Sequence, residues 1–452
     1  MDLQGKKVLI IGMARSGMAS ATFLHQKGAQ VTITDLKTRQ AAGSVADQLE
    51  AQGIGLHLGG YPQLSPGSYD MVVPSPGVPM ETPPVLQALE LGIPVIGEME
   101  LAYQFAHSPI VAITGTNGKT TTTTLVGELF RNAGITTLVG GNIGLPLVTE
   151  VEKYGPKAVI VAEVSSFQLE TIQNFRPRVA MILNLTPDHL DRHKTMEGYG
   201  GAKARIFENQ QPSDFTVLNY DDPAVRAMAD RCSGQVIFFS RQHKLDAGVY
   251  VQDGQVVINH QGKLVAVLDT KDIGIIGAHN LENALAATAA AFVMGIGVEV
   301  IAQTLQTFSG VAHRLEFVRE LAGVRYINDS KGTNPDATIK ALEAFTQPVV
   351  LIAGGKNKGS DFDDLAVLIK ERVKVLVLVG EAAEVIEAAV LRQNFADIKH
   401  ADSFVQGITL AAESAADGDV VLLSPACASW DMFNNFEERG DLFKQVVNNL
   451  RG

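Results

Sequence analysis

The sequence predicts an α/β protein of three domains, each built on a mainly parallel sheet with flanking helices. Two observations lead to this fold class. Short, continuously apolar segments alternate with helical segments along the chain, and such segments are typical of parallel strands that helices cover on both faces. The length of 452 residues also allows two to four domains. We place the domains at residues 1–97, 98–311 and 312–452.

The predicted elements follow one another in the order that this fold class requires. In the first domain we expect a helix at 18–26 and strands at 8–11, 30–34, 71–73 and 94–96. In the second we expect strands at 110–113, 159–162 and 179–183 with helices between them, and helices at 280–293 and 298–308. A turn-rich, alternating stretch at 236–268 predicts short antiparallel strands. The third opens with a hairpin at 315–329, turning at Ala322 and Gly323, before strands at 348–352, 375–379 and 420–423.

Composition excludes several classes of protein. The net charge of -12 argues against nonspecific nucleic-acid binding, which needs a basic surface. We see no apolar run long enough to cross a membrane and no signal peptide, because charged residues precede the first strand. Cys232 and Cys427 cannot form a disulfide framework, so we expect a protein of the reducing cytoplasm.

A glycine loop after the strand at 110–113 suggests nucleotide binding. Residues 115–120 read GTNGKT, with two residues between the glycines where the common phosphate-binding loop has four. Backbone N–H groups would surround phosphates, Lys119 would add positive charge, and Thr120 would offer a hydroxyl to Mg²⁺. The alternative is a glycine turn with Thr120 or Thr121 capping a helix. Such a turn does not need a lysine where the helix dipole disfavours cations.

A second glycine turn, GMARSG at residues 12–17, follows the first strand. With Asp35 ending the next strand it resembles a dinucleotide site, but the middle glycine is missing and a side chain there would crowd a pyrophosphate. A tight strand–helix turn is the plain alternative, and a nucleotide diphosphate other than NAD is a third. The turn at 74–79 could line the same crevice.

Oxygen and nitrogen ligands follow two strands of the second domain. Glu163 stands at a strand's carboxyl end, where ligands of open α/β sheets bind. His189 and His193 have the spacing of zinc ligands, but Leu190 occupies the place of the glutamate in H-E-x-x-H. Asp188 and His189 could instead cap a helix, and we expect His193 to be exposed. Carboxylate ligands suit Mg²⁺ better than zinc.

Four polar loops of the third domain, at 312–316, 328–337, 354–362 and 424–433, together predict an anion-binding crevice. Arg314, Lys331 and Lys358 would be its cations. Turn chemistry explains any one of these loops alone, because Asn, Asp, Ser, Gly and Pro dominate turns. We interpret Cys427 as a small buried residue and not as a nucleophile.

With these pieces placed, the chain resembles the Mur ligase family of ATP-dependent amide-bond-forming enzymes. The resemblance covers all three domains. It is carried by GTNGKTTT and by the stretches 141–144 (GNIG), 163–170 (EVSSFQLE), 186–193 (TPDHLDRH), 278–287 (AHNLENALAA), 313–314 (HR), 328–337 (NDSKGTNPDA) and 424–440 (SPACASWDMFNNFEERG). It implies a Rossmann-like first and last domain and a middle domain similar to a P-loop ATPase. At 331–334 the chain reads KGTN where the family often has KATN, a change that leaves the interpreted side chains untouched.

The third-domain motifs point to the family member that adds D-glutamate to UDP-N-acetylmuramoyl-L-alanine, in peptidoglycan synthesis for cell wall, shape and division. The resemblance implies an acyl phosphate, a tetrahedral intermediate, two Mg²⁺ ions and a monomer that acts on small molecules, without nucleic acid or membrane. It implies that catalysis rests on Lys119, Glu163, His189 and Lys203, the last as a carbamate. From the sequence alone, Lys203 would be a surface lysine on a helix.

The resemblance also implies the residues of each binding site. ATP would contact Gly115, Thr116, Asn117, Gly118, Lys119, Thr120, Thr121, Asn280, Arg314 and Asp329. The UDP-substrate would contact Gly12, Ala14, Arg15, Ser16, Asp35, Ser75, Gly77 and Asn142. D-glutamate would contact Lys331, Thr333, Lys358, Ser429 and Phe436. The metal would be held by Thr120, Glu163, His189 and carbamylated Lys203.

Rival interpretations remain at this point. A folylpolyglutamate synthase shares the short ATP loop but has no need of a UDP crevice. A sibling ligase for meso-diaminopimelate tends to carry an Asp-Asn-Pro-Arg motif, which is absent here. Two alternatives are not amide ligases at all: a nucleotide-dependent switch protein, and an NAD dehydrogenase built on the first domain.

Overall fold

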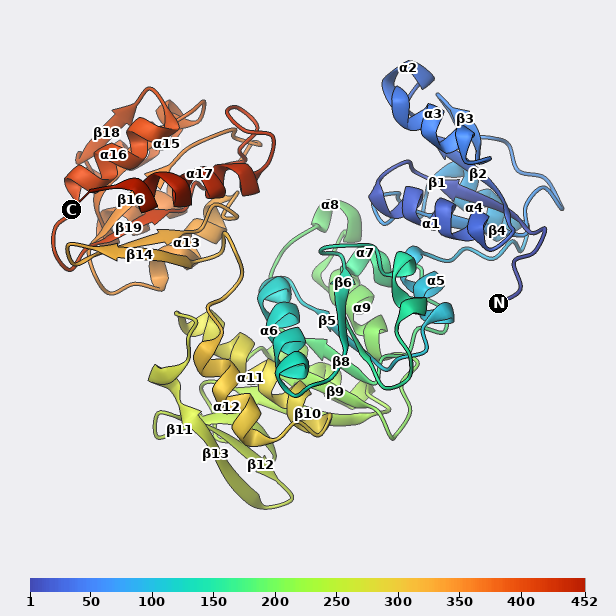
Figure 1. The fold of residues 1–452 in the computed structure, drawn as a ribbon, viewed down its shortest axis with the longest axis horizontal. Helices are drawn as coiled ribbons and strands as arrows, with labels where there is room; N and C mark the ends of the chain where they lie inside the picture. Colours follow the sequence, from blue (N-terminus) through green and yellow to red (C-terminus); the bar gives the residue numbers. More distant parts are fainter. Residues whose placement is uncertain (452) are drawn as a thin grey trace. The chain divides into compact units, whose positions relative to one another are not determined.

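The computed structural model describes residues 1–451, which form three sheets, all of them mainly parallel and flanked by helices (Figure 1). This confirms the predicted fold class. By compactness the chain divides into two units: Met1–Asp272 with Glu282–Gln306, and Ile273–Leu281 with the residues from Thr307 on. Within residues 1–451 the structure holds no helix whose length and hydropathy would let it span a lipid bilayer.

The first sheet is four-stranded and wholly parallel, in the order β3-β2-β1-β4. Its elements are β1 (Lys7–Ile11), α1 (Arg15–Gln26), β2 (Gln30–Asp35), α2 (Arg39–Ala42), α3 (Ser44–Ala51), β3 (Gly55–Leu58), β4 (Met71–Pro74) and α4 (Pro83–Glu90). The strand order reverses between β1 and β4. In open α/β sheets ligands bind at such a point, beyond the carboxyl ends of the strands.

Two expectations for this sheet need correction. The strand predicted at 94–96 is a single bridge between Val72 and Val95, because α5 (Glu98–Phe105) begins before the segment can pair further. We also missed β3, since its sequence, Gly-Leu-His-Leu, places a glycine and an exposed histidine where an apolar run would signal a strand.

The second sheet has nine strands in the order β13-β12-β11-β10-β9-β8-β5-β7-β6. The strands are β5 (Ile110–Thr114), β6 (Thr137–Gly141), β7 (Val159–Glu163), β8 (Val179–Ile182), β9 (Phe215–Asn219), β10 (Gln235–Ser240), β11 (Gly248–Gln252), β12 (Gln255–His260) and β13 (Lys263–Asp269). The helices are α6 (Lys119–Asn132), α7 (Ser166–Leu169), α8 (Leu190–His193), α9 (Met196–Ala204), α10 (Pro223–Arg226), α11 (Ala278–Val293) and α12 (Val298–Thr307).

The antiparallel prediction for residues 236–268 holds only in part. Strands β11, β12 and β13 are antiparallel to one another, but β10 pairs in parallel with both β9 and β11. The connection from β9 to β10 contains α10, and a connection of this length lets two strands run in the same direction.

The third sheet has the order β14-β15-β19-β16-β17-β18. Its strands are β14 (Glu316–Leu321), β15 (Val324–Asn328), β16 (Val349–Ala353), β17 (Val373–Val379), β18 (Ile398–Ala401) and β19 (Val420–Leu423). The predicted hairpin is confirmed: β14 and β15 are antiparallel, and Ala322 and Gly323 both have the positive φ that a two-residue hairpin turn requires. The other pairs are parallel.

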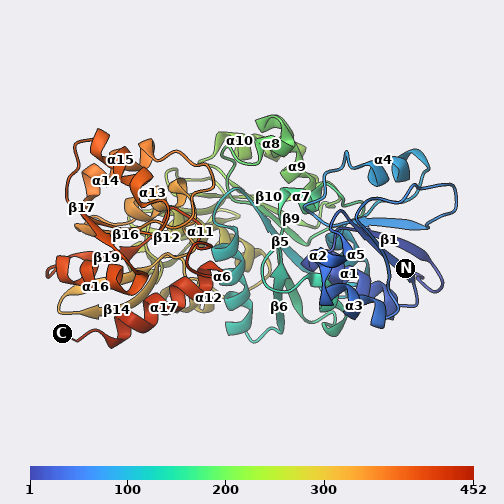
Figure 2. The ribbon, with the colours of Figure 1, turned by 90° about the horizontal axis from the view of Figure 1, so that it is seen from above.

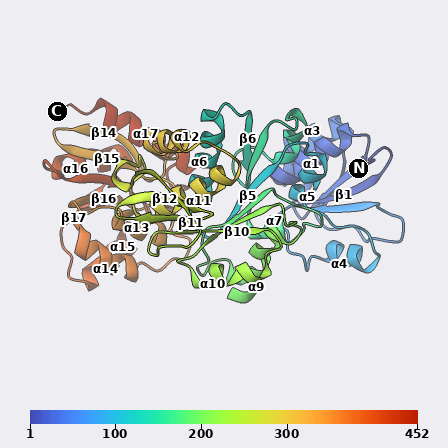
Figure 3. The same ribbon diagram turned by 90° about the horizontal axis from the view of Figure 1, so that it is seen from below.

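Helices cover both faces of this third sheet, as Figures 2 and 3 show. One face packs against α13 (Pro335–Glu343), α14 (Asp363–Arg372) and α15 (Ala383–Arg392), and the other against α16 (Phe404–Ser414) and α17 (Phe436–Asn449). Neighbouring residues of β16 alternate between the two apolar clusters, Leu351 facing one and Ile352 the other. This alternation explains the continuous apolar run in the sequence.

Candidate functional site

The loop between β5 and α6 has the backbone that a phosphate site needs. Gly115 has φ 151° and Gly118 has φ 82°, conformations that residues with a side chain rarely adopt. A Cβ on Gly118 would lie 2.3 Å from Oδ1 of Asn283, so the loop is also closely packed. Gly118 is the N-cap of α6 and supplies no side-chain cap. The alternative in which Thr120 or Thr121 caps this helix is therefore wrong, and the first N–H groups of α6 suit an anion.

Two lysines converge on one carbonyl of this loop. Lys119 Nζ donates to the carbonyls of Gly115, at 2.9 Å, and Thr116, at 2.7 Å. Lys203 Nζ, from α9, donates to the same Gly115 oxygen at 2.9 Å. The Lys119 ammonium, and Lys203 when it is protonated, place positive charge beside the place where phosphates would lie.

Lys203 is buried, with 1% of its surface exposed, so its interpretation as a surface lysine is wrong. Its ammonium lies 4.4 Å from the centre of the Tyr199 ring. Burial, and then the positive charge of Lys119, lower the pKa of Lys203 to about 7, with Asp188 acting in the opposite direction. Near neutral pH a substantial fraction of this side chain is therefore the neutral amine, which is the nucleophilic form.

Glu163 presents a carboxylate oxygen that the protein itself does not use. The residue ends β7 and is buried. Its Oε1 accepts a 2.8 Å hydrogen bond from Nδ2 of Asn142, whereas its Oε2 is buried without a hydrogen-bond partner. Buried polar atoms are nearly always satisfied, so this orphan oxygen fits a cation such as Mg²⁺, for which carboxylates are preferred ligands. Asn142 and Glu163 are thereby brought together.

The two histidines have different environments. His189 is exposed and directly precedes α8, with φ 52° and its ring 4.8 Å from that of Phe167. Its Nε2 lies 3.5 Å from Oδ2 of Asp188. His193, which we expected to be exposed, is half-buried, and its side chain is 4% exposed: its ring stacks on Phe167 and its Nε2 lies 3.0 Å from Oγ of Ser166. The aromatic neighbours explain the error, because nothing in the sequence places them there.

In residues 1–451 no three His, Cys, Asp or Glu side chains lie together as a metal site. The metal ligands that the resemblance implies differ from such a cluster. They combine the Glu163 carboxylate and the His189 ring with the Thr120 hydroxyl, on the first turn of α6, and with a modified Lys203. This set is rich in oxygen only if Lys203 carries a carbamate.

A cavity of about 440 Å³ lies at the switch point of the first sheet. Its lining includes every residue that the sequence assigns to the UDP-substrate: Gly12, Ala14, Arg15, Ser16, Asp35, Ser75, Gly77 and Asn142. Lys37 and Gln168 also line it and were missed, because neither belongs to a glycine turn. Asp35 Oδ2 accepts a 2.7 Å hydrogen bond from the Met13 N–H, so this carboxylate shapes the turn itself. The N-cap of α1, Ala14, provides no side-chain cap.

The second unit holds the three residues assigned to the adenosine and ribose end of ATP. Asp329 is buried, and burial raises its pKa to about 6, although Oγ of Ser424 donates to its Oδ2 at 2.7 Å. Arg314 lies close enough to lower that pKa, and its own Nε is buried without a hydrogen-bond partner. Asn280 is buried and donates to the Ile276 carbonyl at 2.7 Å.

Of the residues assigned to D-glutamate, Phe436 begins α17 and the other four lie on loops of the third sheet's domain. The Lys331 ammonium lies 5.6 Å from the Phe436 ring centre, and the Lys358 ammonium lies 5.8 Å from that of Trp430. Ser429 is buried beside Trp430, which is 66% exposed. Thr333 is half-buried on the loop that follows β15, two residues after Lys331. Cys427 is buried as expected, and burial raises its pKa to about 12, which argues against a reactive thiol.

Arg439 belongs to this region and was missed. It is 1% exposed, and it donates to Oγ and to the carbonyl of Ser330, at 3.0 and 2.8 Å. Its Nη1 is buried without a partner, and burial lowers its pKa to about 10. In the sequence it stands among charged residues of a helix, FEERGD, where a solvated position is the ordinary expectation.

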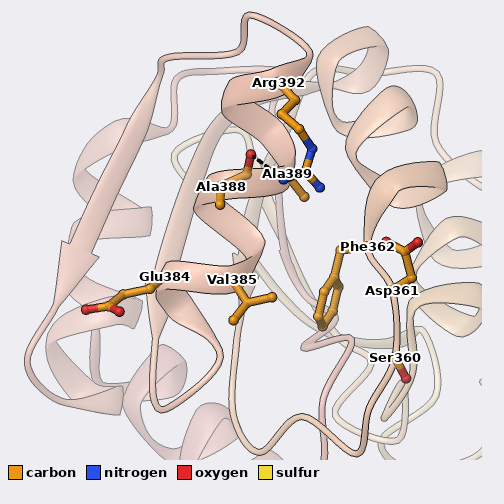
Figure 4. Close-up of a pocket in the computed structure, with 8 residues that line it drawn as sticks. All are labelled: Ser360, Asp361, Phe362, Glu384, Val385, Ala388, Ala389 and Arg392. Atoms are coloured by element: carbon orange, nitrogen blue, oxygen red, sulfur yellow. Dashed lines mark hydrogen bonds between the residues drawn. The ribbon is translucent and has the colours of Figure 1, made fainter.

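A pocket of about 400 Å³ lies elsewhere on the third sheet's domain (Figure 4). Figure 4 shows its lining side chains, which come from Ser360–Phe362 and from α15. None of the predicted site residues lines it, although Lys358 precedes it by two positions. Its Arg392 is paired with Asp363 and exposed, as is usual for a surface ion pair.

Comparison with known proteins places the chain in a family over nearly its whole length. Three family models match: "Mur ligase MurD-like, N-terminal domain" at residues 6–97, "Mur ligase middle domain" at 113–291 and "Mur ligase, glutamate ligase domain" at 313–427.

Curated relatives match end to end. A UDP-N-acetylmuramoylalanine–D-glutamate ligase of Pelotomaculum thermopropionicum is 57% identical, covering 100% of this chain and 99% of its own. One from Clostridioides difficile is 48% identical, covering both chains completely. Among solved structures, MurF from Acinetobacter baumannii has a TM-score of 0.62 at 18% identity, covering 96% and 93% of the two chains. MurC from Thermotoga maritima has a TM-score of 0.60, also at 18% identity, covering 98% and 99%. These two structures show the fold alone.

Proposed function

The chain belongs to the Mur ligase family, and we infer that it is an ATP-dependent ligase that joins D-glutamate to UDP-N-acetylmuramoyl-L-alanine in peptidoglycan precursor synthesis. The observation that carries this inference is the end-to-end match, at 57% identity, to a relative named for that reaction. The folylpolyglutamate synthase, switch and dehydrogenase interpretations are not favoured, because Mur ligase family models match the first and last domains as well as the ATP loop. A sibling ligase is not favoured, because the full-length relatives are named for D-glutamate.

The reaction uses ATP to activate a carboxylate. An oxygen of the L-alanine carboxylate attacks the γ-phosphorus, the bond to the ADP oxygen breaks, and an acyl phosphate forms. The amine of D-glutamate then attacks the acyl carbon, phosphate leaves the tetrahedral intermediate, and the nitrogen loses a proton to give the amide. In this chain the N–H groups at the start of α6 and the Lys119 ammonium would stabilise the charge that builds on the transferring group.

Mg²⁺, when bound, would neutralise phosphate charge and orient the reacting oxygens. The residues that would hold it are Thr120, Glu163, His189 and a carbamylated Lys203, and the buried, unpartnered Oε2 of Glu163 supports this assignment. Glu163 would also be fixed in place by the hydrogen bond from Asn142, whose side chain lines the substrate crevice.

We propose that Lys203 is carbamylated. Its neutral amine would attack CO₂, forming an N–C bond and releasing a proton to water, so that an ammonium becomes an anionic oxygen donor. Two features support this: the side chain is buried, and its pKa of about 7 leaves the amine partly neutral. The change would also convert repulsion between Lys119 and Lys203 into attraction, in a site where both contact the Gly115 carbonyl.

Each domain would bind one substrate. We propose that residues 1–97 hold the uridine diphosphate end, residues 98–311 hold ATP, and residues 312–452 hold the amino acid. In the last of these, Lys331, Lys358 and Ser429 would face the two carboxylates of D-glutamate, with Thr333 and Phe436 completing the pocket. Asn280, Arg314 and Asp329 would contact adenosine and ribose. We further propose that the enzyme acts as a monomer in the cytoplasm.

Stereochemistry tests the proposed amino-acid specificity. The purified protein should form the amide from D-glutamate and form little from L-glutamate, because a pocket that fixes two carboxylates and an amine reads handedness by geometry. Product formation from each enantiomer, followed by mass spectrometry, measures this difference. Equal rates with both enantiomers would contradict the D-glutamate assignment and leave an amide ligase of another specificity.

A further inference from the structure

Arg192, on α8, contacts three residues of two other segments: the turn at Val78, and Phe167 and Glu170 on α7 and its C-terminal end. Its Nη2 donates to the Val78 carbonyl at 3.0 Å, and its Nε lies 3.2 Å from both carboxylate oxygens of Glu170. Its guanidinium also lies 4.6 Å from the ring centre of Phe167. The side chain is 14% exposed, which is unusual for an arginine and indicates a fixed position.

We propose that Arg192 is a positioning residue that couples occupation of the UDP-substrate crevice to the placement of His189. This inference rests on the proposed function, since it assigns the crevice to the nucleotide substrate and His189 to Mg²⁺. The reaction would then depend on Arg192, although this side chain would contact neither the nucleotide substrate nor Mg²⁺.

One end of the coupling is the turn at residues 75–78. Val78 lines the crevice together with Ser75 and Gly77. Its N–H donates to the Ser75 carbonyl at 2.9 Å, and Oγ of Ser75 donates to the Gly12 carbonyl at 3.1 Å. A ligand that orders this turn therefore also orders the acceptor that Arg192 uses. Arg192 and Gly77 further share the lining of a second cavity, of about 540 Å³.

The other end is the pair of short helices, α7 and α8, that lie next to two of the assigned metal ligands in the chain, Glu163 and His189. Helix α7 begins three residues after Glu163, and its Phe167 ring contacts the rings of both His189 and His193. Glu170 accepts from Arg192 and also lies 3.5 Å from Nδ1 of His193. His189 precedes Arg192 by three positions, so a shift of Arg192 moves the backbone that holds His189.

The geometry needs an arginine and not merely a positive charge. A guanidinium is a rigid fork that can bond a carboxylate and a carbonyl at once, whereas a lysine ammonium is a point charge on a flexible stem. Arg192→Lys should therefore keep the pairing with Glu170, which avoids an uncompensated carboxylate, and should lose the contact with Val78. Arg205→Lys is the matched control, because Arg205 also bonds carbonyls at the end of α7, those of Leu169 and Glu170, but has no bond to the turn.

The test is binding without turnover. Calorimetry would measure the dissociation constant of UDP-N-acetylmuramoyl-L-alanine without ATP, at micromolar and at millimolar Mg²⁺. Coupling between two sites is reciprocal, and typical couplings change affinity by about 5–150-fold. In the unaltered protein and in Arg205→Lys, Mg²⁺ should tighten binding by about 5-fold or more. In Arg192→Lys the dissociation constants at micromolar and at millimolar Mg²⁺ should be nearly equal. The melting temperature of this variant should be unchanged.

Three results would overturn the inference. Arg192→Lys could keep the full effect of Mg²⁺, Arg205→Lys could lose it equally, or the unaltered protein could bind the nucleotide with no dependence on Mg²⁺. A fourth result, no binding of the nucleotide to the unaltered protein, would overturn the proposed function and this inference with it.

Discussion

Two strand–turn–helix loops of the chain have a similar backbone conformation but differ in the charged side chains around them. In the first, β1 leads through Gly12 into α1; in the second, β5 leads through Gly115 into α6. Both glycines have positive φ, 97° and 151°, and neither helix receives a side-chain cap at its N-terminus. Each loop therefore presents backbone N–H groups to an anion, in the way that helix N-termini bind phosphates.

The difference lies in which side chains contact the turn. In the first loop a carboxylate, that of Asp35, accepts the Met13 N–H, and the cation Arg15 is exposed. In the second, Lys119 and buried Lys203 both contact the Gly115 carbonyl. The first arrangement is suited to holding a diphosphate. The second places the Lys119 ammonium and the first N–H groups of α6 where charge would develop during phosphoryl transfer, so substitutions there should affect rate more than affinity.

Lys119→Ala should cause the largest effect. Loss of one preorganised charge typically lowers the rate by ~10²–10³ or more, and the half-exposed Lys119 makes no contribution to core packing that would unfold the protein. Steady-state turnover with ATP, together with a circular dichroism spectrum, measures both consequences. A variant that turned over at the rate of the unaltered protein would refute the phosphate-loop interpretation.

Lys203→Ala should also be nearly inactive while still binding ATP. If the missing group is a carbamate, formate or acetate at high concentration should partly restore turnover by supplying an oxygen ligand. The same salts should do nothing for Lys119→Ala, whose missing group is a cation. Full activity of Lys203→Ala, or an unmodified lysine in electron density from crystals grown near neutral pH with Mg²⁺, would contradict the proposed modification.

The pH dependence of this modification has a definite sign. Only the neutral amine reacts with CO₂, and the pKa of Lys203 is about 7. The reactive fraction therefore rises as pH rises from 6 to 8. Protein depleted of CO₂ should regain activity faster at pH 8 than at pH 6 when bicarbonate is restored at a fixed CO₂ concentration. A rate independent of pH across this window would argue against Lys203 as the modified group.

Arg15→Ala, in the first loop, should have the smallest effect. The KM for the nucleotide substrate should rise about tenfold, which corresponds to ~1.4 kcal/mol of binding, and kcat should stay within about twofold. A change in KM alone is the signature of a contact made equally in the ground and transition states. A fall in kcat comparable to that of Lys119→Ala would erase the distinction between the two loops.

The sequence predicts the two loops well because glycine and apolar runs carry local information. Gly12 and Gly115 follow continuous apolar strands, and strand ends of parallel sheets meet at one edge. The cavity at the first switch point accordingly includes every residue assigned to the UDP-substrate. Strands β3, β6, β9 and β18 were missed; in β3 and β6 glycines break the apolar pattern.

What the sequence does not reveal is the burial of polar and charged side chains. Lys203, His193 and Arg439 occur in polar contexts, and their burial depends on residues distant in the chain. Tyr199 and the Gly115 carbonyl enclose Lys203, Phe167 covers His193, and Ser330 satisfies Arg439. Tertiary packing sets the burial of such side chains, and hydrophobic periodicity in the sequence does not predict it.

The most direct test of the account is phosphate release from ATP by the purified protein. UDP-N-acetylmuramoyl-L-alanine and D-glutamate would be added separately and together, with Mg²⁺ present throughout. The account predicts sustained phosphate release only when both are present, because the acyl phosphate needs the amine to complete each cycle. Equal release with ATP alone would indicate a nucleotide hydrolase or switch and would contradict the proposed ligase.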